Sequence, residues 1–346
     1  MVLQIQFLMG YCGPIQERCG NSIMTTYKLL LIVSVVAICL SAGEKEPEKT
    51  CRYLVDTRNC SNLKIYNDEI CWIENDAIWS TSRAEPKRQL IYRCGEGRIT
   101  DFSIYNNQIY LSTDYGNIIL FNRESAKEVL LRKISGPVED IIIKEQNVFA
   151  ASVLYHDTRQ LHPRNCIIRI SVETGSADTI VNLNEHILKM MFHKNALYFV
   201  SVSSKKEPVT DILDDIDKKP QTTLSWNLHK IIPGEDNFKN IFKSPDPVSI
   251  ECDPDNIYLI SDSLVQQVHN GKITPLPVSS IKKFLAVSKN WILGMSQKDS
   301  VVCLNRISGK WNFLSVQDTV PVSTAFIYEN SAVILCKNKM YECILE

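Results

Sequence analysis

The segment DFSIYNNQIYLSTDYGNIILFNRESAKEVLLRK, residues Asp101–Lys133, contains the clearest structural pattern of the chain. It predicts four short strands, separated by turn-forming residues such as Asn106-Asn107 and Gly116. The predicted strands are Phe102–Tyr105, Gln108–Ser112, Ile118–Asn122 and Glu128–Leu131. An isolated four-stranded sheet of this size would be marginally stable. The pattern therefore indicates several such units stacked face to face around an axis, as the blades of a β-propeller are.

Degenerate copies of the pattern recur along the chain. Each copy has a few apolar residues, a polar turn that often carries Asn or Asp, and an apolar strand. Seven copies begin at Leu63, Phe102, Asp140, Leu188, Val248, Lys282 and Ser323. Their spacing of about 35 to 60 residues fits the blade period of a propeller. Each copy is expected to supply the first two strands of a blade, with strand one lining the central channel. A six-bladed ring, or a sandwich with coincidental spacing, is the alternative.

The seventh blade is one strand short, because its last predicted strand is Met340–Leu345. A spare strand is predicted at Cys51–Val55, before the first blade, and could complete the seventh. We therefore predict an all-β fold, a single propeller of seven blades closed by its N-terminal strand, which removes an open sheet edge. A disulfide between Cys51 and Cys343 would fasten this closure.

The N-terminal region has the layout of a secretory signal peptide. From Met24 it has one lysine, an apolar run over Leu29–Leu40 and small residues over Ser41–Gly43. The apolar run is shorter than the roughly 20 residues of a spanning helix, which favours cleavage over a retained signal anchor. We assign residues 1–23 to an upstream extension, 24–43 to the signal peptide, 44–50 to a flexible tail and 51–346 to the propeller. The protein is expected to be secreted, without stable membrane insertion after cleavage.

Composition narrows the classes of partner. The net charge of −1 gives no electrostatic case for binding nucleic acid. Nine of the twelve cysteines follow residue 43, so at least one is free or pairs with another chain in an oxidising compartment. Their spacing is not that of a zinc site, and no cofactor motif is present. Asn59-Cys60-Ser61 is the single N-glycosylation acceptor pattern.

Two predicted connections between strands two and three are long. They are residues 155–165 of blade three and 203–223 of blade four, on adjacent blades at the same end of the ring. Long loops in compact domains are often functional, and the aromatic and cationic side chains of the first suit a planar anionic ligand. The candidate ligand-binding residues are Tyr155, His156, Arg159, His162, Arg164 and Trp226. For any one of the loop residues, a solvated position is the alternative.

Three segments share an aromatic signature: Ile109-Tyr110-Leu111-Ser112-Thr113-Asp114, Ala196-Leu197-Tyr198-Phe199 and Asn256-Ile257-Tyr258-Leu259. They loosely resemble the strands of YWTD-type propellers. Together with the signal peptide, the layout also resembles insect ommochrome-binding haemolymph proteins. That resemblance implies a soluble carrier of a tryptophan-derived pigment and assigns no ligand-contacting residue. The long blade-four insertion and the many cysteines depart from the family pattern.

Three functions are compatible with these features. The first is a secreted, non-enzymatic carrier of a small aromatic ligand, and the second is an extracellular module that binds a receptor or matrix protein. The third is a metal-dependent propeller hydrolase. No nucleophile elbow, zincin motif, phosphate-binding loop or dinucleotide fingerprint is present, which favours the non-enzymatic functions.

Overall fold

The structure is a computed structural model that describes residues 48–154, 164–206, 222–235, 237–262, 264–269, 271–278, 281–316 and 322–345. They belong to one compact unit, Pro47–Glu346. The predicted upstream extension and signal peptide lie outside the described residues. Within the described part, no helix is long and apolar enough to cross a membrane.

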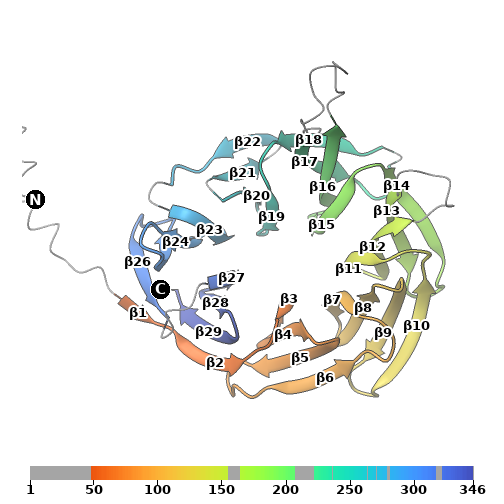
Figure 1. Ribbon diagram of the computed structural model, residues 1–346, viewed down its shortest axis with the longest axis horizontal. Coiled ribbons are helices and arrows are strands. Elements are labelled where there is room, and N and C mark those ends of the chain that lie inside the picture. The colour runs from red at the N-terminus through yellow and green to blue at the C-terminus, as the bar shows by residue number, and fades with distance from the viewer. Residues whose placement is uncertain are drawn as a thin grey trace, which may run out of the picture. The chain divides into compact units, whose positions relative to one another are not determined.

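The described strands form seven sheets arranged as blades around an axis (Figure 1). The innermost strands are β3 (Ser61–Tyr66), β7 (Ile99–Tyr105), β11 (Val138–Lys144), β15 (His186–His193), β19 (Ser249–Cys252), β23 (Ile281–Val287) and β27 (Val322–Tyr328). The second strands are β4 (Glu69–Glu74), β8 (Gln108–Thr113), β12 (Asn147–Leu154), β16 (Ala196–Lys206), β20 (Ile257–Ile260), β24 (Trp291–Ser296) and β28 (Ser331–Cys336).

The outer half of each blade completes the sheet. The third strands are β5 (Ala77–Ser82), β9 (Asn117–Asn122), β13 (Arg164–Ser171), β17 (Thr222–Ile231), β21 (Val265–His269), β25 (Val301–Asn305) and β29 (Lys339–Ile344). The outermost strands are β6 (Gln89–Arg93), β10 (Lys127–Lys133), β14 (Ala177–Leu183), β18 (Lys239–Ser244), β22 (Lys272–Pro275), β26 (Trp311–Ser315) and β2 (Arg52–Asp56). The predicted seven-bladed, all-β propeller is confirmed.

Local sequence explains the blades. In blade two, Asn106 and Asn107 both adopt positive φ between β7 and β8, as a tight hairpin turn requires. At Gly116 the φ is +77°, and a side chain there would collide with the backbone oxygens of Ile134 and Gly136. The second strand, β8, is almost wholly buried, whereas the outermost, β10, is mostly exposed. Each blade thus has an apolar middle, which neighbouring blades cover.

The core consists of seven apolar clusters, each shared by two neighbouring blades. Between blades one and two, for example, Ile78 packs with Phe102 and Ile109. The cluster that closes the ring joins Leu335 of blade seven to Ile70 and Trp72 of blade one. No interface between the described blades lacks such a cluster, so the propeller buries its sheets through stacking rather than through one central core.

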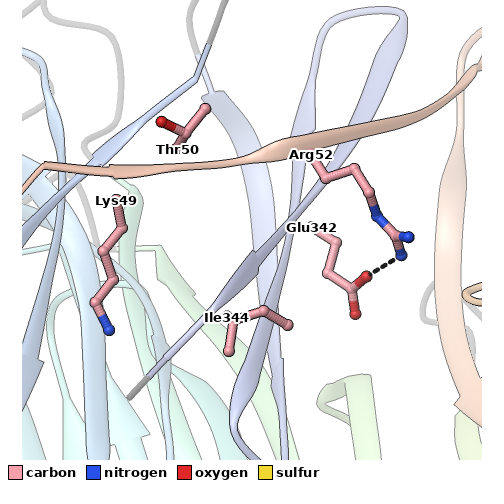
Figure 2. Close-up of a pocket in the computed structure, with 5 residues that line it drawn as sticks. All are labelled: Lys49, Thr50, Arg52, Glu342 and Ile344. Atoms are coloured by element: carbon pink, nitrogen blue, oxygen red, sulfur yellow. Dashed lines mark hydrogen bonds and ion pairs between the residues drawn. The ribbon is translucent and has the colours of Figure 1, made fainter.

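The N-terminal strand closes the ring as predicted. Strand β2 pairs antiparallel with β29, with Arg52 opposite Glu342. The Cys51–Cys343 disulfide joins the two segments. The buried Glu342 carboxylate also binds Arg52 at 2.7 Å, an ion pair visible in Figure 2, and Arg83 of blade one at 2.5 Å. Covalent and ionic contacts therefore reinforce the same junction.

One boundary prediction is corrected. Residues 44–50 were expected to form a flexible tail, but Glu48–Thr50 form β1, which pairs parallel with β26 of blade six. The backbone N–H of Cys51 continues this pairing by donating to the Ser315 oxygen at 3.0 Å. The free edge of β26 satisfies the backbone of a short polar segment, so pairing here does not need an apolar sequence.

Candidate ligand site at the mouth of the channel

A cavity of about 300 Å³ lies where several innermost strands begin. Its lining comes from β3, β7, β11, β15 and β27, with one residue of β28 and one from the connection before β3. It comprises Cys60, Ser61, Asn62, Leu63, Lys64, Asp101, Glu139, Asp140, Leu188, Lys189, Thr324, Phe326 and Leu335. Because Ile99 pairs with Thr113, the beginning of strand one lies beside the end of strand two. The cavity is therefore at the end of the ring that carries the two-to-three connections, the end predicted to bind the ligand.

Two carboxylates and one ammonium meet in the cavity. Asp101 on β7 and Asp140 on β11 are both buried, and Lys64 Nζ on β3 is 3.4 Å from Asp101 Oδ1. Each carboxylate is fixed by a backbone amide of the next blade. Ile141 N–H donates to Asp101 Oδ2 at 3.1 Å, and Met190 N–H donates to Asp140 Oδ2 at 2.5 Å. The packing of blades therefore positions the acids.

Their environment disfavours two full negative charges. Burial, and then the neighbouring Asp101 carboxylate, raise the pKa of Asp140 well above its usual range. Burial lowers the pKa of Lys64, but Asp101 and Asp140 outweigh it and leave that pKa raised. Asp101 Oδ1 is buried and accepts no hydrogen bond from the described residues, although Lys64 lies nearby. The site thus has two acidic side chains, one nearby cation and one carboxylate oxygen, Asp101 Oδ1, without a hydrogen-bond donor among the described residues.

The rest of the cavity is mixed in character. Leu63 and Leu335 are buried, Phe326 is half-buried, and Leu188 is exposed at the rim. At the same rim, Glu139 Oε2 is 3.0 Å from His186 Nε2, and the bond to Glu139 raises the pKa of that histidine. An apolar wall beside convergent polar groups is typical of pockets that bind small molecules.

A second polar cluster contains Ser201, His229 and Glu185, residue types that form hydrolytic triads. Ser201 Oγ is 2.8 Å from His229 Nε2, and it also donates to Glu185 Oε2. Glu185 Oε2 lies 3.2 Å from the same Nε2, while Nδ1 is buried without a hydrogen-bond partner among the described residues. A triad needs the acid on the opposite ring nitrogen from the serine. With Ser201 and His229 both buried, this cluster is a structural network.

The structure does not place the predicted ligand-binding residues in this cavity. Tyr155, His156, Arg159 and His162 lie outside the described residues. Arg164 begins β13, where its backbone pairs with Leu154, and its side chain is not described. Trp226 on β17 packs against the apolar cluster between blades four and five and does not line the cavity.

Other predicted features can be located. The connection expected over 203–223 begins later, because β16 and β17 remain paired as far as Lys206 and Thr222. Asn59 is exposed, at a φ of 51°, in the connection before β3. The adjacent Cys60 is a free thiol, so no disulfide at that residue obstructs the acceptor asparagine. Among the described residues, no group of three or more His, Cys, Asp or Glu side chains is arranged to hold a metal ion.

The sequence reasoning did not identify Asp101, Asp140 and Lys64. A signal was present: in the repeated pattern, a polar residue precedes the apolar run of several innermost strands. It is Asp101 in β7, Asp140 in β11 and Lys189 in β15, each four residues before the end of its strand, whereas Lys64 in β3 is two residues before the end. Aligning the repeats at that position would have placed Asp101, Asp140 and Lys189 around the same end of the channel, and Lys64 would not have been found in this way.

No protein-family model matches the chain, and no curated protein matches its sequence. Solved propellers match its structure. Virginiamycin B lyase from Staphylococcus aureus aligns with a TM-score of 0.57 at 11% identity, over 84% of this chain and 98% of the lyase. Oligogalacturonate lyase from Vibrio parahaemolyticus has a TM-score of 0.53 at 9% identity, over 86% and 91%. The computationally designed Ika8 protein has a TM-score of 0.53 at 12% identity, over 86% and 99%. Such low identity shows a shared fold alone.

Proposed function

We propose that this protein is a secreted, non-enzymatic binding protein that carries a small aromatic ligand in the cavity at the mouth of the channel. The observation that carries the proposal is the cavity itself, in which an apolar wall faces fixed, buried polar groups. Its volume of about 300 Å³ is at the lower limit of small-molecule sites, which run from about 300 to 1,000 Å³. A single substituted aromatic ring system fits this size.

The ligand class follows from two separate lines of reasoning. The resemblance to ommochrome-binding proteins favours a tryptophan-derived pigment, and Phe326, Leu63 and Leu335 provide apolar surface for an aromatic body.

Secretion rests on the signal peptide predicted over 24–43. The Cys51–Cys343 disulfide is compatible with it, because such bonds persist in oxidising compartments.

The non-enzymatic part of the proposal rests on the geometry of the polar clusters. Ser201 and His229 are buried, and the acid sits on the wrong ring nitrogen for a triad. The two similar lyases share the fold at 11% and 9% identity, which transfers no activity to this chain.

The test is direct. Protein isolated from its native fluid is analysed by absorption spectroscopy and by mass spectrometry of released small molecules. A co-purifying aromatic compound, present in stoichiometric amounts, supports the carrier function. A colourless protein that also fails to bind kynurenine or tryptophan derivatives in calorimetric titrations contradicts it.

An extracellular protein-interaction module is the second candidate. Cys252 is an exposed free thiol available for an intermolecular bond. On the outermost strand β10, Val129 and Leu130 are 51% and 55% exposed. Exposed apolar side chains on an open strand edge are suited to contact with another protein. Cross-linking in the native fluid, followed by identification of the linked chain, would favour this function over the carrier.

A further inference from the structure

The acid pair of the cavity includes a buried oxygen, Asp101 Oδ1, to which no described residue donates a hydrogen bond. Asp101 is only 2% exposed, lines the cavity, and has an oxygen, Oδ1, that accepts no hydrogen bond from the described residues. A buried carboxylate oxygen without a donor is costly, because desolvation of the charge is not compensated. Its ion-pair partner among the described residues is the Lys64 ammonium at 3.4 Å.

The charges that face the acid pair come from four strands. On β3 there is Lys64, on β7 Asp101, on β11 Asp140 with Glu139 at the rim, and on β15 the exposed Lys189. Glu139 is paired with His186, so its negative charge adds little to the charge balance around Asp101 and Asp140. Lys64 is the cation closest to the two buried carboxylates among the described residues, and burial, followed by the Asp101 carboxylate, raises the pKa of Asp140. An additional cation would allow both acids to ionise.

We infer that the ligand presents a primary ammonium group to Asp101 and Asp140, with its aromatic body against the apolar wall of the cavity. This inference rests on the proposed carrier function and narrows its ligand to an amine. An ammonium group offers three N–H donors, one of which can serve Asp101 Oδ1 while another reaches the Asp140 carboxyl group beside it. Because the backbone amides of Ile141 and Met190 already hold the other oxygens, the acceptors are fixed before the ligand arrives.

Three indole compounds distinguish the contribution of the amine to binding from that of the aromatic ring system. Tryptamine has only the amine, indole-3-propionic acid has only the carboxylate, and L-tryptophan has both. Calorimetric titration of the wild-type protein at pH 7.5 is expected to show tryptamine binding at least tenfold more tightly than indole-3-propionic acid. This comparison needs no variant, so it is independent of any effect of mutation on folding.

Two variants then locate the contact. Asp101→Asn keeps an oxygen for the Ile141 amide but removes the charge, and it is expected to weaken tryptamine binding at least tenfold. Glu251→Gln is the matched control. Glu251 is another inner-strand carboxylate that accepts the next blade's backbone amide, Val287 N–H, at 2.8 Å, and it does not line the cavity. This control is expected to bind tryptamine within twofold of wild type.

The possible outcomes are distinct. Preference for tryptamine that D101N abolishes and E251Q retains supports the inference. Equal or tighter binding of indole-3-propionic acid overturns the amine inference and leaves the carrier function standing. Binding of none of the three compounds by folded wild-type protein overturns the inference together with the aromatic-carrier function. Preference for tryptamine that survives in a folded D101N variant overturns the assignment of the ammonium to the acid pair.

Discussion

Cys51 and Cys343 are joined by a disulfide although 292 residues of sequence separate them, with their Cα atoms 4.4 Å apart. The bond closes nearly the whole described ring into one covalent loop. A cross-link over so long a segment removes much of the conformational entropy of the unfolded chain and thereby stabilises the folded protein.

The first prediction concerns this bond. The double variant C51S/C343S is expected to lower the free energy of unfolding by about 4 kcal/mol, because its unfolded chain is no longer constrained. Urea denaturation followed by intrinsic fluorescence measures the change. Dithiothreitol should destabilise the wild-type protein and leave the double variant unaffected, while C252S, at an exposed free thiol, should respond to it as wild type does. Equal midpoints for wild type with and without the reductant would contradict the prediction.

The ion pairs at the ring closure give the second prediction. Glu342 is 4% exposed and its carboxylate serves both Arg52 and Arg83. Glu342→Gln keeps the shape but leaves two guanidinium groups sharing a neutral acceptor, so a loss of about 2 kcal/mol is expected. Thermal or urea unfolding measures it.

An exposed ion pair provides the control for that variant. Lys282 Nζ and Asp299 Oδ1 are 2.8 Å apart on the surface. Surface pairs contribute little, so D299N should change the stability by less than about 0.5 kcal/mol. If E342Q and D299N have the same effect, the Glu342 network does not stabilise the closure.

The fold was predictable because its signals are local and repeated. Asparagines such as Asn106 and Asn107 mark the turns, and the apolar second strands mark the blade centres. The closure followed from counting strands, since the spare strand near Cys51 matched the gap in the last blade. Strand β1 escaped prediction because Glu48–Thr50 has no apolar alternation and pairs only through the edge that β26 offers.

The site was less predictable for a physical reason. Asp101 and Asp140 each look like ordinary polar residues at the beginning of a strand, and neither belongs to a motif. They become neighbours only because successive blades place equivalent positions side by side around the channel. Long loops draw attention in a sequence through length and composition, and the sequence reasoning therefore favoured Tyr155–Arg164 over the shorter innermost strands.

The third prediction tests the location of the ligand. Leu188 lines the cavity and is 43% exposed, so a charge is tolerated there by the fold. L188E places a carboxylate against the aromatic body of the ligand and is expected to weaken the binding of L-tryptophan at least fivefold, because the apolar contact is lost. Leu224 on β17 is also 43% exposed and does not line the cavity, so L224E is the matched control. Calorimetric titration that finds the two variants equally impaired, or equally unaffected, argues against this cavity.

The fourth prediction concerns Glu251 and pH. Burial raises the pKa of this carboxyl from 4.5 to about 7, although Val287 N–H and Lys189 act in the opposite direction. The folded state therefore holds the proton more tightly than the unfolded state. The stabilisation that comes from this bound proton is complete below about pH 4.5 and is lost as the pH rises towards 7.

Glu251→Gln removes this titration while keeping an acceptor for the Val287 amide. Relative to wild type, E251Q is expected to gain about 2 kcal/mol of stability between pH 5 and pH 8, since each unit of pKa shift corresponds to about 1.4 kcal/mol. Urea unfolding of both proteins at several pH values gives the difference. A wild-type minus E251Q difference that stays constant with pH would mean that Glu251 is ionised in the folded protein throughout this range.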